Sequence, residues 1–325
     1  MGREKSRRRA VGLFGGGLDS VLAFRSMRDA GVTVEGVYLD TGFVREAHQR
    51  HARATANVET IDVRQRYLEE VVAAPRHGYG SGMNPCHDCR AFMLARADEW
   101  AAVRGVTSLF TGDVIGQRAH DQSHHALRLA DRESGTTGRV RRPLCGAHLE
   151  EVEGPGPALR LQGRSRREQL RLARDWDVGE FPTPSGRCCR LADPAFARRV
   201  RDYLEHRPAG ELRATDIPML GRGRHFRLGW NLKVILSRNE AEAGQLAEWG
   251  AALGHCEPLE TPGPQGWIEG ACADAETDRD IAALIAHHTA GAGADGIDVR
   301  IRQDSRERVV RAAPIDEETL ARWRV

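Results

Sequence analysis

Short apolar runs alternate with amphipathic stretches in the first third of the chain. Four of these runs have the length and composition of buried parallel strands, and they cover residues 10–14, 32–39, 58–63 and 107–113. Apolar side chains at helical spacing occupy residues 19–30 and 90–105 between them. Strands that alternate with helices predict a doubly wound α/β domain with a parallel sheet, whose ligands bind at the carboxyl ends of the strands.

The pattern changes in the middle of the chain. Residues 135–165 are rich in Gly, Pro and Arg with little periodicity, which predicts irregular structure. A helix is expected over residues 165–178, with Ser165 as its N-cap and Glu168 completing a capping box. Another helix is expected over residues 194–208, where a proline ends it.

A second unit is expected after Pro208. The segment HFRLGWNLKVIL predicts two strands around a turn, and a helix is expected from Asn239. A further helix and two strand candidates, IDVRI and RVVRAAP, follow from Asp274. We therefore predict two domains, an α/β domain over residues 1–209 and a smaller α+β domain over residues 210–325.

Composition narrows the function classes. The chain has 325 residues and 40% hydrophobic residues, but no apolar run reaches the roughly 20 residues that a membrane span needs. The N-terminus is charged and no apolar stretch follows it, so we expect a cytoplasmic protein without membrane association. The formal net charge is only +2, so any surface for nucleic acid must be local.

The run FGGGLDS, residues 14–20, joins the first predicted strand to the first helix. Glycines at such a junction let backbone N–H groups approach an anion, and a helix N-terminus favours phosphate. The run lacks the Gly-Lys-Ser/Thr of a Walker A loop and the glycine spacing of a dinucleotide fingerprint. An acid at Asp19 is consistent with a phosphate site if the carboxylate binds Mg²⁺.

FGGGLDS resembles the SGGxDS signature of the PP-loop, or ATP-pyrophosphatase, superfamily. Phe14 stands where serine is usual, and the match runs from Gly15 through Ser20. The resemblance implies that the loop binds the pyrophosphate of ATP and that ATP is split to AMP and pyrophosphate. It implies ATP and Mg²⁺ as cofactors, with Asp19 assisting the metal. The predicted nucleotide-binding residues are Phe14, Gly15, Gly16, Gly17, Asp19, Ser20, Asp40, Gly112, Asp113 and Gln117. The last four are included because they lie at or just after the ends of the second and fourth predicted strands, and capping of a turn or helix is the alternative for Asp40 and Asp113.

Four further stretches are similar to the branch of this superfamily that includes tRNA 4-thiouridine synthetase and tRNA 2-thiouridylase. They are NPCHDC at 84–89, TGDVIGQRAHDQ at 111–122, RRPLCGAHLEE at 141–151 and SGRCCRLADP at 185–194. The last of them matches the segment that carries a catalytic cysteine. The stretch LGRGRHFRLGWNLKVILSRNEAE, residues 220–242, resembles the NFACT-R type of RNA-associated domain, which occurs fused behind such PP-loop domains.

The cysteines indicate metal or thiol chemistry. Cys86 and Cys89 are three residues apart, and a third thiol comes from Cys188 or Cys189, between which the sequence does not choose. Three thiolates can bind a 4Fe-4S cluster and leave one iron for an exchangeable sulfur, and several thiouridine-forming relatives use such clusters. A persulfide on Cys188 or Cys189, resolved by Cys86 or Cys89, is the second interpretation. A structural zinc completed by Asp88, His87 or Cys145 is the third.

These features predict an ATP-dependent sulfurtransferase that adenylates a uracil carbonyl oxygen in tRNA and replaces it with sulfur. Asp19, Cys188 and Cys189 are the expected catalytic residues. The expected partners are tRNA and a sulfur donor such as sulfide or a cysteine desulfurase. Three other interpretations stay open: a PP-loop enzyme that thiolates a small molecule, a PP-loop ligase that uses ammonia, and a non-catalytic RNA-binding protein.

Overall fold

The computed structural model describes five stretches of the chain: residues 9–118, 121–149, 156–182, 189–272 and 274–325. The chain forms two compact units, Met1–Asp193 (unit 1) and Pro194–Val325 (unit 2). The end of the expected first domain, at residue 209, lies in unit 2, after the helix α8, Pro194–Glu205.

Unit 1 is built on a five-stranded sheet in which all neighbouring strands are parallel, in the order β3-β2-β1-β4-β5. The strands are β1 (Arg9–Leu13), β2 (Thr33–Asp40), β3 (Val58–Asp62), β4 (Leu109–Thr111) and β5 (Val140–Arg141). The helices of four or more residues are α2 (Leu18–Asp29), α3 (Glu46–Ala54), α4 (Arg64–Tyr67), the π-helix Leu68–Val72, α5 (Cys86–Val103), α6 (His124–Glu133) and α7 (Arg167–Asp175). Short 3₁₀ turns occupy Gly146–His148 and Arg190–Ala192.

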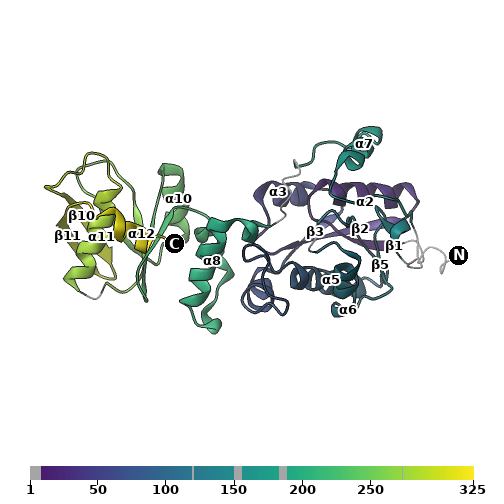
Figure 1. Ribbon diagram of the computed structural model, residues 1–325, viewed down its shortest axis with the longest axis horizontal. Coiled ribbons are helices and arrows are strands. Elements are labelled where there is room, and N and C mark those ends of the chain that lie inside the picture. Colours follow the sequence, from purple (N-terminus) through teal and green to yellow (C-terminus); the bar gives the residue numbers. More distant parts are fainter. Residues whose placement is uncertain (1–8, 119–120, 150–155, 183–188, 273) are drawn as a thin grey trace. The chain divides into compact units, whose positions relative to one another are not determined.

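The helices cover both faces of the sheet. Helices α2 and α3 lie on one face, and α5 and α6 lie on the other (Figure 1). Buried side chains of β1, β2 and α2, among them Phe24, Met27 and Tyr38, form the main core of the unit. The structure thus confirms an α/β unit with a parallel sheet, in which the loops after β1 and β4 open at the same edge.

The antiparallel sheet of unit 2 has the order β11-β10-β8-β9-β7-β6. Its strands are β6 (Arg224–Gly229), β7 (Leu232–Leu236), β8 (Gly254–Pro258), β9 (Gly266–Gly270), β10 (Ile297–Gln303) and β11 (Arg306–Ala312). Its helices are α8, α9 (Ile217–Leu220), α10 (Glu240–Trp249), α11 (Ala275–His287) and α12 (Glu317–Trp323), and 3₁₀ turns lie at Ala209–Glu211 and Ala214–Asp216.

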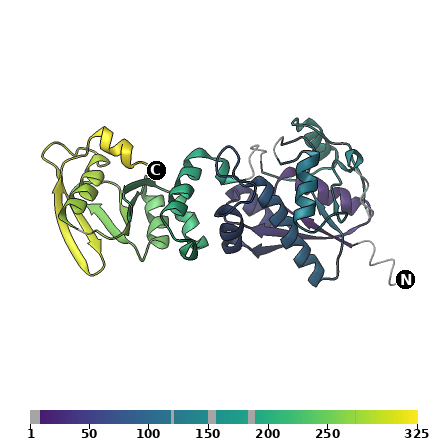
Figure 2. The same cartoon turned by 60° about the horizontal axis from the view of Figure 1, so that its bottom comes forward.

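Helix α11 packs against the sheet of unit 2 and closes its core (Figure 2). Ile281 and Ile285 of this helix are fully buried beside Phe226, Val234 and Ile301 of the strands. The expected helix start at Asn239 is confirmed, because its side chain accepts a hydrogen bond from the Glu242 N–H. In the described parts of both units, no helix is long and apolar enough to cross a membrane.

Two local expectations in unit 1 are wrong. Helix α5 begins at Cys86, four residues before the expected start, so Cys86 and Cys89 lie in its first turn rather than in a preceding loop. The capping box at Ser165 is not completed: α7 begins at Arg167 with Arg166 as its N-cap, and the Ser165 hydroxyl accepts only a hydrogen bond of 3.4 Å from the Arg167 N–H. The Glu168 carboxylate instead accepts hydrogen bonds from Arg171, one turn along the helix.

Candidate functional site

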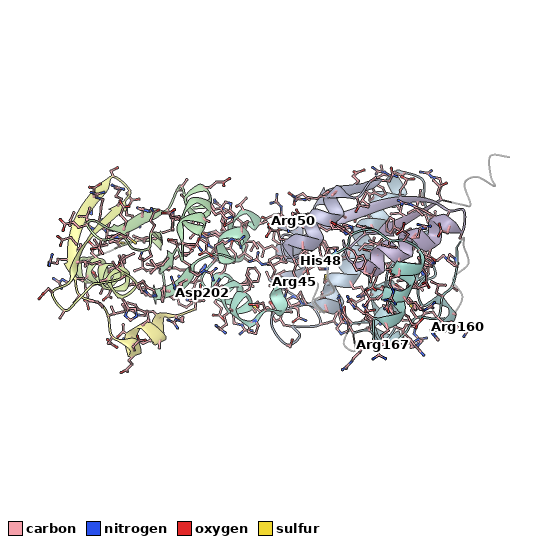
Figure 3. The ribbon with its side chains drawn as sticks, turned by 90° about the horizontal axis from the view of Figure 1, so that it is seen from above. Arg45, His48, Arg50, Arg160, Arg167 and Asp202 are labelled. Atoms are coloured by element: carbon pink, nitrogen blue, oxygen red, sulfur yellow. The ribbon has the colours of Figure 1, made fainter. Side chains whose placement is uncertain are left out.

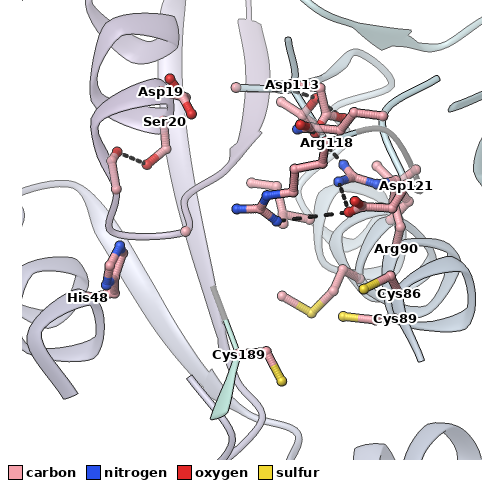
Figure 4. A pocket seen from close by; sticks show the side chains of 18 of the residues that line it. Asp19, Ser20, His48, Cys86, Cys89, Arg90, Asp113, Arg118, Asp121 and Cys189 are labelled. Atoms are coloured by element: carbon pink, nitrogen blue, oxygen red, sulfur yellow. Dashed lines mark hydrogen bonds and ion pairs between the residues drawn. The ribbon is translucent and has the colours of Figure 1, made fainter. Parts of the chain in front are cut away.

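A pocket of about 240 Å³ lies at the edge of the unit 1 sheet where β1 and β4 end. Figure 4 shows Asp19, Ser20 and His48 on one side of it and Arg90, Asp113, Arg118 and Asp121 opposite, with Cys86, Cys89 and Cys189 below. The lining residues that matter here are Gly15, Gly17, Asp19, Ser20, His48, Cys86, Cys89, Arg90, Gly112, Asp113, Arg118, Asp121, Arg166 and Cys189. The pocket therefore joins the glycine loop and the paired cysteines, which are far apart in the sequence.

The glycine loop turns sharply at Gly16, whose φ of 72° is the left-handed conformation that favours glycine. A Cβ there would lie 2.1 Å from the backbone oxygen of His48, so α3 packs directly against the loop. A ring nitrogen of His51 lies 2.8 Å from the Gly16 carbonyl oxygen. Gly15 and Gly17, on either side of the turn, line the pocket.

Phe14 lies in the core rather than along the pocket. Its side chain is 2% exposed, and its ring meets that of Phe24 edge to face at a centroid distance of 5.0 Å. Its backbone N–H donates to the Val37 carbonyl on β2. Phe14 thus anchors the start of the loop through packing, and it brings no hydroxyl to the pocket.

Asp19 and Ser20 begin α2 and line the pocket. The Ser20 hydroxyl donates to the Gly17 carbonyl oxygen at 2.6 Å, which fixes the loop to the helix. One carboxylate oxygen of Asp19 accepts a hydrogen bond from Gln117 at 2.7 Å, and the other is buried with no hydrogen-bond partner among the described residues. Burial raises the pKa of this carboxyl, although Gln117 and Arg166 oppose the shift.

Gln117 itself is not among the residues that line the pocket. Its buried side-chain amide nitrogen donates to Asp19. Its side-chain amide oxygen accepts a hydrogen bond from Gln169 on α7 at 2.8 Å. This chain of amides holds the Asp19 carboxylate in one orientation. Gln117 therefore acts on the pocket through Asp19.

Gly112 follows β4 and lets the end of that strand approach α2. A Cβ at this position would lie 2.6 Å from the backbone carbon and oxygen of Asp19 and 2.7 Å from the Ser20 nitrogen. Only a residue without a side chain permits this contact, which sets the width of the pocket between the two loops.

Asp113 is the centre of a buried charge network. Its carboxylate forms ion pairs with Arg90 and Arg142, and it accepts hydrogen bonds from Thr111 at 2.8 Å and Gln122 at 3.3 Å. Burial alone would raise the pKa of this carboxyl, but the two guanidinium groups and the Thr111 hydroxyl outweigh burial and hold it below the ordinary value. Asp113 is therefore ionised and fixes Arg90 at the pocket wall.

Asp40 ends β2 but does not line the pocket. Its buried carboxylate accepts hydrogen bonds from the Gly42 N–H at 3.0 Å, Gln49 at 3.1 Å and Arg53 at 2.7 Å. These partners tie β2 to α3, the helix that supports the glycine loop.

Cys86 and Cys89 occupy the first turn of α5 and line the pocket. The Asn84 amide donates a hydrogen bond to the Cys86 sulfur at 3.1 Å, and its oxygen accepts one from the Gly82 N–H. Asn84, part of the Asn-Pro motif, thus organises the loop before the helix. The neighbouring Asp88 carboxylate points away to accept hydrogen bonds from the backbone at residues 76 and 77.

Cys189 lines the same pocket, and backbone contacts of Leu191 and of Cys189 itself hold its segment there. The Met83 N–H donates to the Leu191 carbonyl at 3.0 Å, and a Cβ on Gly82 would lie 2.5 Å from that oxygen. Val44 and Cys189 form an isolated antiparallel bridge on the other side. The sulfur of Cys189 also accepts a hydrogen bond from the Leu191 N–H at 3.3 Å. The alternative third cysteine, Cys188, lies outside the described residues.

The pocket offers the donors of a thiolate-bound centre without a preformed metal geometry. Cys86, Cys89 and Cys189 are directed into one cavity (Figure 4), and thiolates are the usual ligands of zinc and iron–sulfur clusters. Over the described ranges, no three Cys, His, Asp or Glu side chains converge closely enough to hold an ion. The donor set fits such a group in chemistry, and binding it requires the thiols to move together.

The other described cysteines do not line the pocket. Cys145, a possible zinc ligand, is fully buried and its thiol donates to the Asp113 carbonyl at 3.1 Å. Burial raises its pKa to about 11. Cys256 and Cys272 belong to unit 2, where Cys256 is part of the core.

The sequence did not point to four of the residues that line the pocket: His48, Arg90, Asp121 and Arg166. His48 lies on α3, between Arg45 and Arg50 in sequence (Figure 3). Burial, with Arg45 nearby, lowers the pKa of His48, so its imidazole is neutral near pH 7. Arg90 directly follows the CHDC motif, so its position in the sequence could have identified it as a candidate site residue.

Residues 223–324, within unit 2, match the family model of the NFACT protein RNA binding domain. Unit 2 is similar to an RNA-binding domain. The match covers less than half of the chain and does not extend to unit 1. A search of curated proteins finds no match.

Two solved structures show remote likeness to the chain. The C-terminal part of the fibronectin/fibrinogen-binding protein from Streptococcus suis has 9% identity and a TM-score of 0.28, over 49% of this chain and 79% of that one. A predicted subunit of tRNA methyltransferase from Methanocaldococcus jannaschii has 16% identity and a TM-score of 0.32, over 57% of this chain and 98% of that one. Scores this low carry no weight for fold or function.

Proposed function

We propose that the protein is an ATP-dependent enzyme that adenylates a uracil carbonyl oxygen in tRNA and replaces that oxygen with sulfur. One observation carries the proposal: a glycine loop at a helix N-terminus, three cysteines and a carboxylate with one oxygen that no described residue hydrogen-bonds line the same pocket. A thiolation enzyme needs these parts within reach of one substrate atom.

The loop between β1 and α2 is the proposed pyrophosphate site. Backbone N–H groups of Gly15, Gly16 and Gly17 precede a helix N-terminus, where negative charge is stabilised. Arg118 and Arg166 line the pocket and supply positive charge toward the leaving pyrophosphate. His51, which contacts the Gly16 carbonyl, holds the turn in place.

Asp19 is the proposed Mg²⁺ ligand. Its unpartnered oxygen is buried at the pocket wall, whereas its other oxygen is held by Gln117. A hard cation takes carboxylate oxygens and usually keeps phosphate and water ligands as well. Bound there, Mg²⁺ would reduce repulsion between the Asp19 carboxylate and the polyphosphate.

The proposed reaction has two displacements. The uracil oxygen attacks the α-phosphorus, a new P–O bond forms, the bond to pyrophosphate breaks, and the adjacent ring nitrogen loses its proton. Hydrosulfide then attacks the ring carbon, a C–S bond forms and AMP leaves with the electrons of the C–O bond. The sulfur's proton moves to the ring nitrogen, so uridine, ATP and hydrosulfide give thiouridine, AMP and pyrophosphate.

The three cysteines are the proposed sulfur-handling residues. A 4Fe-4S cluster held by Cys86, Cys89 and Cys189, or Cys188 in its place, would leave one iron open for an exchangeable sulfur. In the second form, Cys189 or Cys188 carries a persulfide from a cysteine desulfurase. The outer sulfur of this persulfide attacks the ring carbon in place of hydrosulfide and AMP leaves. Cys86 or Cys89 then forms a disulfide with the persulfide cysteine, which releases thiouridine, and an external dithiol reduces the disulfide.

The metal content distinguishes these two forms. Anaerobically purified protein is expected to be brown and to contain iron and acid-labile sulfide, both lost in Cys86→Ala and Cys89→Ala. Cys272→Ala, a half-buried thiol of unit 2, is the matched control and should keep both. Colourless, metal-free protein that retains thiolation activity would support the persulfide form, and zinc-loaded protein would contradict both.

The nucleotide half of the proposal is tested by pyrophosphate release with ATP, Mg²⁺, sulfide and tRNA. Asp19→Asn and Ser20→Ala should each slow release, because the first removes the charged oxygen and the second frees the loop from the helix. Pyrophosphate release at the wild-type rate in Asp19→Asn would refute the assigned role.

The acceptor is proposed to be RNA because unit 2 is similar to an RNA-binding domain. Nucleoside analysis of tRNA from a deletion strain should show one thiouridine missing, and the wild-type gene should restore it. Restoration by Cys189→Ala would contradict the proposed role of this thiol. Unchanged thionucleosides in the deletion strain would direct the search to a small-molecule acceptor.

A further inference from the structure

Trp230 occupies an unusual position in unit 2. It lies in the two-residue connection between β6 and β7 and is 69% exposed, although it is among the largest apolar side chains. Tight hairpin turns favour Gly, Asn and Asp at such positions. A tryptophan here gains little from packing, so its presence calls for a ligand that buries it.

The turn that carries Trp230 is held rigidly. Arg227 donates to the Trp230 carbonyl oxygen at 3.4 Å and makes two hydrogen bonds of 2.8 Å to Asp202 on α8. On the other side, a Cβ at Gly270 would lie 1.6 Å from the Asn231 carbonyl oxygen, so the end of β9 presses against the turn. The indole is therefore presented on a fixed support, which lowers the entropic cost of binding.

A cavity of about 270 Å³ lies beside the indole. Its walls include Tyr203, His206 and Arg207 near the end of α8 and Asn231 on the turn. The His206 ring lies 4.6 Å from the Trp230 ring, centroid to centroid, so the two rings form one aromatic corner. Asp202, which fixes the turn, lies in this part of unit 2 (Figure 3).

The arginines that line this cavity are paired with carboxylates. Arg207 forms ion pairs with Glu269 and Asp216, and Arg227 forms one with Asp202. Such neutralised cations are poor phosphate ligands, because a phosphate would have to displace the carboxylates. A flat, uncharged aromatic ring with polar edges fits the site better, since it can stack on the indole and meet amide and carboxylate groups at its rim.

We infer that Trp230 and the adjoining cavity bind an unpaired RNA base by stacking. The family match to an RNA-binding domain spans residues 223–324 and therefore includes Trp230. Stacking on aromatic side chains is a common way in which proteins hold single-stranded bases, because every base has an aromatic face. The inference rests on unit 2 alone and stands whether or not unit 1 adenylates RNA.

The test compares full-length Trp230→Ala, Trp230→Phe and Trp249→Ala. Trp249, which is 36% exposed on α10, is the matched control for loss of a surface tryptophan in the same unit. The probes are a fluorescent oligouridine and the same strand in a duplex, measured by anisotropy over a range of salt concentrations. Circular dichroism confirms that each variant is folded.

Trp230→Ala should raise the Kd for oligouridine by about 5- to 150-fold, the range for loss of one stacked base. Trp230→Phe should recover most of the affinity, and Trp249→Ala should bind as the wild type does. The slope of log K against log salt should not change, because no phosphate contact is removed. Equal binding by Trp230→Ala and Trp249→Ala, an equal loss for the duplex, or a reduced salt slope would each overturn the inference.

Discussion

The contact between Gly112 and α2 gives the sharpest test of how the pocket is built. In Gly112→Ala, the new Cβ would lie 2.6 Å from the Asp19 backbone, whereas ordinary contacts begin at about 3.4 Å. The first turn of α2 must therefore retreat by roughly 0.8 Å, since the atoms it meets are backbone and cannot rotate away. Overpacking of this kind costs about 1–3 kcal/mol of folding free energy.

The same displacement moves Asp19 and Ser20 relative to the β4 loop. A misplacement near 1 Å reduces reaction rates by about 100-fold, so we expect a loss of that order in ATP-dependent pyrophosphate release. Hydrogen exchange should also become faster for amides in the first turns of α2. Both effects follow from one methyl group placed outside the nucleotide loop.

Gly179→Ala is the matched control, because a Cβ at Gly179 meets nothing within 4 Å and its φ is not positive. The assays are pyrophosphate release, urea unfolding followed by circular dichroism, and hydrogen exchange of α2. If Gly112→Ala matches Gly179→Ala in all three, the close approach of β4 to α2 does not shape the pocket and the reasoning is refuted.

Three further predictions concern buried groups. Asp113→Asn should lower the free energy of unfolding by about 1.5–3 kcal/mol, because the buried Arg90 and Arg142 each lose one carboxylate and keep only Asp121 and Asp131. The pKa of Asp113 is lower in the folded than in the unfolded protein. Its contribution to the free energy of unfolding is therefore fully present above the unfolded pKa, near 3.9, and is lost as the pH falls through the folded pKa. Urea midpoints measured from neutral to acid pH should therefore fall faster in the wild type than in the variant, and parallel curves would contradict this. Lys233→Met should lower the unfolding free energy of unit 2 by about 1 kcal/mol, because Asp202 loses one buried partner and keeps its two hydrogen bonds from Arg227, and an unchanged urea midpoint would contradict it. Cys145 and Cys256 should resist alkylation by iodoacetamide near pH 8 in the native protein, because burial raises the pKa of both thiols. Mass spectrometry measures the labelling, and rapid alkylation of either cysteine in the folded protein would contradict the prediction.

Four of the five strands of unit 1 were predicted, and β1, β2 and β4 were recognisable because central parallel strands are buried on both faces and read as apolar runs. Strand β5, Val140–Arg141, lies in the segment that was expected to be irregular. Helix α3 was not predicted, since Ala52 is its only buried residue and its sequence EAHQRHARA has almost no apolar face. Contacts with the glycine loop, made by His48 and His51, explain why this polar segment lies where it does.

The candidate site was predictable where a local motif carries it and not where tertiary packing does. Gly15, Gly17, Ser20 and the two cysteines of CHDC belong to motifs, and the structure places them along one pocket. His48 and Arg166 reach that pocket from segments without any motif. Asp40 shows the opposite case. Its position at the end of a strand suggested a ligand-binding acid, but its carboxylate accepts hydrogen bonds from residues close to it in the sequence.

The place of Cys189 in the chain has a consequence for synthesis on the ribosome. The last strand of the unit 1 sheet ends at Arg141, so the sheet can pair well before the segment after residue 189 has been made. The contacts of Leu191 with Met83 and of Cys189 with Val44 form only afterwards. A nascent chain can therefore hold a folded sheet and an exposed glycine loop while the third described thiol of the pocket is still missing. The pocket acquires that thiol only when nearly all of the unit has left the ribosome.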